Sequence, residues 1–336
     1  MYKTAPVLVL LAACAAPAPD PGLRAKVDAA VAGTPRVDLV VGVIADGRPS
    51  VFGYGADGAT VFEIGSITKA FTGALLATLA AEGKVAPDDP VQRHLPPDWT
   101  APSRLGRPIT LAQLATHTSG LPRLPDNLGP KDLRNPYADY SDARLREFLA
   151  RVTLGTSPGE RYAYSNLGAG LLGWILARVD GRSYEELVVD RICGPLGLKD
   201  TRIALSDGQK RRLAPGHSGG QAVWNWDIPV ISGAGALRST ADDLLRFLAA
   251  NLEGRFAASH QPRFRTSEGD TWVALGWHVS PLPGGRPMVW HNGGTGGYRS
   301  FAGFVKESRT AVVVLSNTAE DFVDPLGVAI LELLQR

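Results

Sequence analysis

The sequence predicts an α+β protein in which one antiparallel sheet is built from both ends of the chain, with flanking helices and an inserted, mainly helical domain. Three observations predict this fold class. A β-rich hairpin stands near the start, hairpin-spaced strands return near the end, and the long segment between them has the texture of helices and loops. The chain has 336 residues, of which 44% are hydrophobic and 20% charged, so it can bury a large core.

The first 22 residues have the composition of a targeting segment and a tether. Lys3 precedes an apolar run from Pro6 to Ala13, which is far shorter than the roughly 18–20 residues that span a membrane. The run ends in Leu-Ala-Ala-Cys at Cys14, which resembles the bacterial lipobox, whose cysteine is lipid-modified and becomes the mature N-terminus. The alternative is ordinary signal cleavage among these small residues. Both interpretations predict export, and lipidation adds the membrane as a partner.

Residues 23–65 and 215–336 are predicted to form the sheet domain. The segment Val37–Tyr54 has β-rich residues on both sides of Asp46-Gly47, which is a strong hairpin signal. Near the other end, strands are separated by turns that contain glycine and proline, and a helix over Pro325–Leu334 follows. The predicted strands are Trp272–Val279, Met288–His291, Tyr298–Val305 and Thr310–Ser316. Their hairpin spacing predicts antiparallel pairing.

Residues 66–214 are predicted to form the inserted helical domain, with the active site at its junction with the sheet domain. After a short strand over Thr60–Ile64, apolar residues recur every 3.6 residues from Ser66 to Gly83 and also fill the other face, which predicts a helix buried nearly all round. A second apolar helix is predicted over Gly168–Val179. The loop Leu121–Tyr140, rich in Pro, Asp and Asn, is of the kind that borders binding sites.

Charge and cysteine content exclude several functional classes. The 35 Lys and Arg residues nearly balance 33 Asp and Glu residues, so there is no basic surplus for nucleic-acid binding. The two cysteines, Cys14 and Cys193, exclude a disulfide framework or a thiolate metal site. His94, His260 and His278 lack metal-ligand spacing, so neither a metal nor a cofactor is expected. The sequence does not predict an oligomeric state.

Ser66 and Lys69 are the candidate nucleophile and base. A lysine one turn after a serine lies on the same helical face, within reach of the hydroxyl. Burial would lower the pKa of Lys69, so that the neutral amine accepts the serine proton. Backbone N–H groups at the start of the helix would meet a developing oxyanion. The alternative interpretation is an N-terminal capping serine beside a lysine that extends to water.

Two further motifs supply polar groups. Tyr164 offers a phenol that can pass on a proton, and Asn166 offers an amide for a substrate amide; the alternative is a buried tyrosine and a helix-capping asparagine. In His291-Asn292-Gly293, the glycine would let a substrate backbone approach the strand edge, and Gly294 would offer an N–H. The alternative there is a glycine-rich hairpin.

The ordered motifs Ser66-x-x-Lys69, Tyr164-x-Asn166 and His291-x-Gly293 resemble those of the serine β-lactamase and penicillin-binding superfamily, in its class C β-lactamase and D-Ala-D-Ala carboxypeptidase branch. Further matching stretches are Leu114–Pro122, Pro195–Thr201 and Gly233–Asp243, so that the resemblance covers nearly all of the chain after the targeting segment. It implies an acyl-enzyme on Ser66, proton transfer by Lys69 and Tyr164, and substrate binding by Asn166, His291 and Gly293. The N–H groups of Ser66 and Gly294 would form the oxyanion hole.

The resemblance has one departure, because class C β-lactamases usually carry a lysine where this chain has His291. A histidine there is similar to certain D-Ala-D-Ala carboxypeptidases, and we expect a partly protonated His291 to bind a substrate carboxylate in a pH-dependent manner. The predicted function is therefore an extracytoplasmic serine hydrolase acting on D-alanyl-D-alanine peptides, β-lactams or both. The alternatives are a class C type β-lactamase, a carboxylesterase, and a sensor that is acylated by a β-lactam without turnover.

Two other patterns are not assigned to catalysis. Gly216–Gly220 matches the Gly-x-Ser-x-Gly elbow of α/β-hydrolases around Ser218, but no strand is predicted before it and no helix after it. His117 lies in a turn rich in threonine and serine, where a histidine is usually a structural hydrogen-bonding residue.

Overall fold

The computed structural model describes residues 21–32, 38–267 and 269–336, and its main feature is one antiparallel sheet of eight strands. The strand order is β2-β1-β14-β13-β12-β11-β10-β9. The strands are β1 Leu39–Ala45, β2 Arg48–Tyr54, β9 Phe264–Arg265, β10 Trp272–Val273, β11 His278–Pro281, β12 Pro287–Gly294, β13 Arg299–Val305 and β14 Thr310–Ser316. The predicted α+β fold class is confirmed, because β1 from the start of the chain pairs with β14 from its end.

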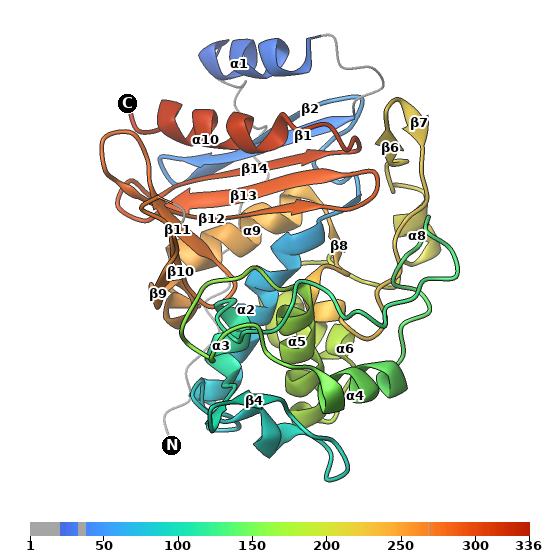
Figure 1. The fold of residues 1–336 in the computed structure, drawn as a ribbon. Helices are drawn as coiled ribbons and strands as arrows, with labels where there is room; N and C mark the ends of the chain where they lie inside the picture. Colours follow the sequence, from blue (N-terminus) through green and yellow to red (C-terminus); the bar gives the residue numbers. More distant parts are fainter. Residues whose placement is uncertain (1–20, 33–37, 268) are drawn as a thin grey trace, which may run out of the picture.

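Both faces of the sheet are covered by helices (Figure 1). Helices α1 (Pro21–Val31) and α10 (Val323–Leu333) cover one face, where α10 packs on β13 and β14. Helix α9 (Ala241–Leu252) packs on β1 and β14 from the other side. Since both faces of β1 and β14 are covered, these strands are runs of apolar residues instead of alternating apolar and polar ones.

The remaining helices lie beyond α9, on the side away from α10 (Figure 1). They are α2 Thr68–Ala81, α3 Leu111–Ala115, α4 Asp142–Arg151, α5 Asn166–Asp180, α6 Tyr184–Val188, α7 Gly194–Leu196 and α8 Asp207–Lys210. As predicted, α2 is buried around most of its circumference, because it packs against α5 as well as against the α9 side, where the rings of Phe71 and Phe247 stack at 4.0 Å. The division into a helical domain over 66–214 and a sheet domain stays a prediction.

Short elements complete the described chain. The 3₁₀-helices are η1 Gly65–Ile67, η2 Val91–His94, η4 Ser232–Ala234 and η5 Ala257–His260, and η3 Val189–Cys193 is a π-helix. Three two-stranded pairs join β3 Phe62–Glu63 to β8 Arg238–Ser239, β4 Ser103–Arg104 to β5 Arg107–Pro108, and β6 His217–Ser218 to β7 Gln221–Ala222. None of the helices in the described part of the chain has the length and apolar character needed to cross a membrane.

Three predicted boundaries differ from the structure. The single strand expected over Trp272–Val279 is two strands, because the chain turns between β10 and β11, where Gly276 has a φ of +74°. The helix expected from Ser66 begins with one 3₁₀ turn, η1, and becomes α-helical at Thr68. Strand β12 continues through Gly294, so the third motif lies within a strand and not in a hairpin turn.

Candidate active site

Ser66 lies in the tight turn that leads from β3 into α2. Gly65 before it has a φ of +47°, a backbone conformation that residues with a Cβ rarely adopt. A Cβ at Gly65 would stand 2.7 Å from the backbone nitrogen of Gly294, and one at Gly293 would stand 2.1 Å from the carbonyl oxygen of Ile64. The glycines therefore let the Ser66 turn and strand β12 touch backbone to backbone.

Lys69 is buried beside Ser66. Its side chain is 1% exposed, and its Nζ donates hydrogen bonds to Asn166 Oδ1 at 2.9 Å and the Ala234 carbonyl oxygen at 2.7 Å, and lies 2.9 Å from Ser66 Oγ. All three partners are uncharged oxygens. Burial lowers the pKa of Lys69 well below its usual value, and the positive charge of Arg123 lowers it further. The site therefore favours the neutral amine, which can take a proton from Ser66.

Tyr164 forms the third member of this group. Its hydroxyl makes a hydrogen bond with the Ser66 side chain, and Lys69 Nζ lies 4.8 Å from the centre of its ring. Burial raises the pKa of Tyr164 to about 12, although the hydrogen bond to Ser66 and the charge of Arg123 act in the opposite direction. At neutral pH Tyr164 is consequently a phenol, which can donate a proton, and not a phenolate.

Asn166 is placed by the start of helix α5. Ser165, not Asn166, is the N-cap residue: its hydroxyl accepts a hydrogen bond from the Gly168 N–H at 2.9 Å. Asn166 is thus the first residue of the helix, and its amide is free to turn towards Lys69. The structure does not support the alternative that Asn166 is there to cap the helix.

His117 lies beside Tyr164 and has the structural hydrogen-bonding role that the sequence indicated. It is buried, has a φ of +57°, and its ring lies 4.4 Å from that of Tyr164. Its Nδ1 accepts a hydrogen bond from the backbone N–H of Ser165 at 3.1 Å, and its carbonyl oxygen accepts one from Ala163 at 2.8 Å. His117 therefore holds the segment on either side of Tyr164 in position.

His291 does not carry the charge that the sequence analysis expects of it. It is 1% exposed, and burial lowers its pKa well below the usual value. Because the Asn292 carbonyl oxygen lies 2.6 Å from Nδ1, that nitrogen carries the proton, and Nε2 has no hydrogen-bond partner among the described residues. The expectation of a partly protonated His291 near neutral pH is wrong, since its unpartnered nitrogen is an acceptor and a carboxylate also only accepts.

Strand β12 presents a free edge to Ser66. Strand β11 pairs with β12 only from Pro287 to Trp290, so the stretch His291–Gly294 is paired on one side by β13 and on the other side approaches the Ser66 turn. The oxyanion hole formed by the N–H groups of Ser66 and Gly294 stays a prediction, which the close approach of these two backbones supports.

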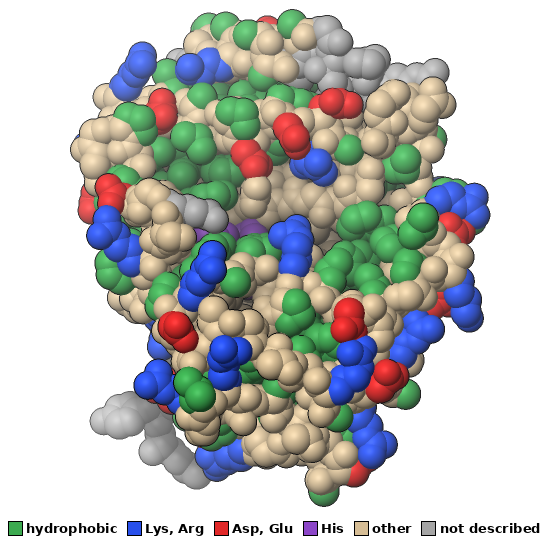
Figure 2. Space-filling view, viewed as in Figure 1, with side chains coloured by type: hydrophobic (Ala, Val, Ile, Leu, Met, Phe, Trp, Pro, Cys, Tyr) green, Lys and Arg blue, Asp and Glu red, His purple; other side chains and the backbone are tan. Residues whose placement is uncertain are grey.

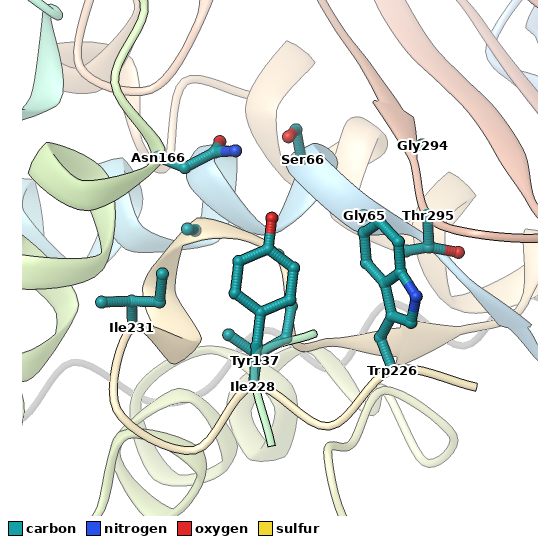
Figure 3. A pocket seen from close by; sticks show the side chains of 11 residues that line it. Gly65, Ser66, Tyr137, Asn166, Trp226, Ile228, Ile231, Gly294 and Thr295 are labelled. Carbon is teal, nitrogen blue, oxygen red and sulfur yellow. The ribbon is translucent and has the colours of Figure 1, made fainter. Parts of the chain in front are cut away.

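A small pocket of about 30 Å³ opens beside Ser66, Asn166 and Gly294. Figure 3 shows the hydroxyl of Tyr137 directed towards the space between Asn166 and Ser66. The other walls are mostly apolar and are formed by Trp226, Ile228, Ile231, Ala234, Gly235, Gly65 and Thr295. Sequence analysis flagged the loop that contains Tyr137 but not the residue, and of the residues from 226 to 235 it covered only 233–235, at the start of the matching stretch Gly233–Asp243.

Two long loops that line this pocket are joined by hydrogen bonds and a ring contact. Asn135 and Asp227 exchange two hydrogen bonds, from the Asn135 amide to Asp227 Oδ2 at 2.9 Å and from the Asp227 N–H to Asn135 Oδ1 at 2.8 Å. The rings of Tyr137 and Trp226 meet edge to face at 5.4 Å. The N–H of Trp226 also donates to the buried carboxylate of Glu63 at 3.0 Å. These contacts hold the pocket walls in a defined position.

The other residues noted in the sequence lie elsewhere or outside the described part. Ser218 is exposed in the β6–β7 hairpin, which is not the strand-to-helix turn of a nucleophile elbow. Cys193 is buried, and Cys14 lies outside the described residues. His278 lies 5.1 Å from His291, ring centre to ring centre. Within the described ranges, no group of three or more His, Cys, Asp or Glu side chains is arranged to hold a metal ion.

The chain is similar to several known proteins. The family model described as Beta-lactamase matches residues 23–335. The D-alanyl-D-alanine-carboxypeptidase/endopeptidase AmpH of Escherichia coli K12 is 30% identical over 276 residues, which cover 76% of this chain and 70% of AmpH. A protein of the same strain named Beta-lactamase is 28% identical, with 83% of each chain covered.

Solved structures show the same fold. The β-lactamase/D-alanine carboxypeptidase of Yersinia pestis superposes with a TM-score of 0.80 at 24% identity, covering 94% of this chain and 99% of that one. A mutant class C β-lactamase also superposes with a TM-score of 0.80, at 21% identity, covering 93% and 97% of the two chains.

The fold and the family match define a serine hydrolase of the β-lactamase and DD-peptidase type. This chain belongs to the β-lactamase family, within the serine β-lactamase and penicillin-binding superfamily, as the sequence motifs indicated.

Proposed function

We propose that this serine hydrolase cleaves D-alanyl-D-alanine peptides through an acyl intermediate on Ser66. The observation that carries the proposal is the buried Lys69, whose Nζ lies 2.9 Å from Ser66 Oγ with uncharged partners only. A lysine in such surroundings can act as the base, because the lowered pKa leaves its amine neutral with a free lone pair for the serine proton.

The chemistry follows from these positions. Ser66 Oγ attacks the peptide carbonyl carbon while its proton moves to Lys69 Nζ, and the oxyanion that forms is stabilised by the N–H groups of Ser66 and Gly294. When the carbon–nitrogen bond breaks, the leaving amine takes the proton of the Tyr164 hydroxyl, and Lys69 returns its own proton to Tyr164. Water then attacks the ester on Ser66 and releases the acid. The pKa of Tyr164, near 12, suits a donor that stays protonated until the leaving amine becomes basic.

The pocket beside Ser66 supports a D-alanyl substrate. At about 30 Å³, with Trp226 and Ile231 in its walls, it suits a small apolar substituent such as the methyl group of alanine. The relative AmpH, which is named a D-alanyl-D-alanine-carboxypeptidase/endopeptidase, supports the same substrate class.

We expect the purified protein to release D-alanine from an acetylated D-Ala-D-Ala dipeptide with a higher kcat/KM than it shows for a chromogenic cephalosporin. Both substrates, and a short-chain ester, are measured side by side with the Ser66→Ala variant as the blank. Faster turnover of the cephalosporin would identify a class C type β-lactamase. Hydrolysis of the ester alone would identify a carboxylesterase, and stable labelling by a β-lactam without release would identify a sensor.

We also propose that the protein is exported and held at the membrane by lipid on Cys14. The lipobox-like sequence before Cys14 supports this proposal. In an expressing bacterium, the parent protein should fractionate with membranes, and the Cys14→Ser variant should move to the soluble fraction, because the acyl chains are lost. Soluble parent protein in the same fractionation would contradict the anchor but leave the enzymatic proposal intact.

A further inference from the structure

The cation nearest the catalytic tyrosine, apart from Lys69, is Arg123. Its guanidinium carbon lies 5.2 Å from the centre of the Tyr164 ring, and its side chain is exposed. Its positive charge acts on Lys69, His117, Tyr137 and Tyr164. Figure 2 shows that Lys and Arg side chains border the hollow in which histidine is visible. Arg123 thus places a permanent positive charge beside Tyr164.

The backbone around Arg123 is attached to the Tyr164 motif, so its position is not accidental. Its carbonyl oxygen accepts a hydrogen bond from the Leu167 N–H at 3.1 Å, and the preceding carbonyl, of Pro122, accepts one from Ser165 Oγ at 2.7 Å. These two bonds lie on either side of Asn166. Since they involve only backbone atoms of the loop, the Arg123 side chain can be changed without disturbing them.

The guanidinium of Arg123 has no carboxylate partner among the described residues. Other arginines near the loop are engaged: Arg151 pairs with Asp126, and Arg144 donates to the carbonyl oxygen of Leu128. The second arginine at the site, Arg299, donates to Asp321 at 3.0 Å. Arg123 therefore has N–H donors at the edge of its planar guanidinium available for a ligand, and a carboxylate is the group that matches this geometry.

We propose that Arg123 determines specificity by binding a carboxylate of the substrate. Among the described residues, His291 does not supply a positive charge for a carboxylate, because its unpartnered nitrogen is an acceptor. The inference rests on the proposed function, since it assumes a substrate that acylates Ser66. The carboxylate has two possible sources: the end of the leaving residue, or a group on the acyl side of the scissile bond.

The test uses three peptides with the same scissile bond. Acetyl-D-Ala-D-Ala has its carboxylate on the leaving side, succinyl-D-Ala-D-Ala amide has it on the acyl side, and acetyl-D-Ala-D-Ala amide has none. In Arg123→Met, kcat/KM should fall about 10- to 100-fold for one carboxylate peptide, the loss expected for a hydrogen bond to a charged group. It should change less than about threefold for the neutral amide. The peptide that responds identifies the source.

The matched control is Arg161→Met. Arg161 is also exposed and only three residues before Tyr164, yet its charge is not among those that shift the pKa of Lys69 or Tyr164. This variant should leave the ratio between charged and neutral peptides unchanged. Removing the Arg123 charge also raises the pKa of Lys69, so that kcat/KM rises at a higher pH for every substrate. The ratios between peptides are therefore compared over a full pH profile.

Two results would overturn the inference. Equal losses for all three peptides would show that Arg123 acts only through the field at Lys69 and Tyr164, and equal activity of Arg123→Met and wild type would show no role. If the wild-type protein cleaves none of the peptides, the proposed function fails. The inference is then tested by comparing the rates at which benzylpenicillin and its methyl ester label Ser66, because only benzylpenicillin has a carboxylate for Arg123.

Discussion

The Ser66→Ala variant is expected to lose covalent labelling by a β-lactam completely and hydrolysis by about 10⁶-fold. In the proposed mechanism Ser66 Oγ is the attacking atom, and it lies 2.9 Å from Lys69 Nζ. Without the hydroxyl, a water molecule would have to find the same position and orientation, which the alanine methyl group does not provide. Intact-mass spectrometry after incubation with benzylpenicillin measures the label, and D-alanine release measures hydrolysis.

The matched control for this variant is Ser218→Ala. Ser218 lies in the sequence pattern of a nucleophile elbow but is exposed in the β6–β7 hairpin. Its replacement should leave both labelling and hydrolysis unchanged. Labelling that survives in Ser66→Ala and disappears in Ser218→Ala would show that the nucleophile is Ser218, and the account of the site given above would then be wrong.

Lys69→Met and Tyr164→Phe are each expected to reduce the rate of acylation by about 10²- to 10⁴-fold, because each removes one partner of a single proton-transfer path. Methionine is chosen at position 69 because it fills a similar buried volume without an amine. The double variant should be about as slow as the slower single variant, since removing either residue already interrupts the path. Stopped-flow measurement of β-lactam acylation gives the four rates; if the losses multiply, the two residues serve separate steps.

The dependence of kcat/KM on pH is a second test of proton transfer through Lys69. Only the neutral amine of Lys69 accepts the Ser66 proton, so kcat/KM should rise with pH through the pKa of Lys69, which burial and Arg123 place well below the usual value. Tyr164 has its pKa at about 12 and should not contribute a limb near neutral pH. In Lys69→Met the acid limb should disappear. An unchanged acid limb in this variant would assign it to another group.

Local patterns were sufficient to predict the parts of the site that are close in sequence. Ser66 and Lys69 are one helical turn apart, so the helix period alone brings their side chains together. Gly293 and Gly294 follow a predicted strand and lie on its edge, as expected. Helix propensity placed α2 and α5 correctly, but not the 3₁₀ turn at Ser66, because that turn is set by the contact between Gly65 and Gly294, which are distant in the sequence.

By itself, the sequence determined the fold class, the antiparallel sheet made from both chain ends and the ordered motifs around Ser66, Tyr164 and His291. It did so because strand and helix periods, turns and motif spacing are local properties of the chain. Tertiary structure alone decided which charges the site carries. Burial among Lys69, His278 and the protein core makes His291 neutral, and loop packing places His117 and Arg123 beside Tyr164. A pKa depends on the surroundings of a group in space, and those surroundings come from residues that the sequence keeps far apart.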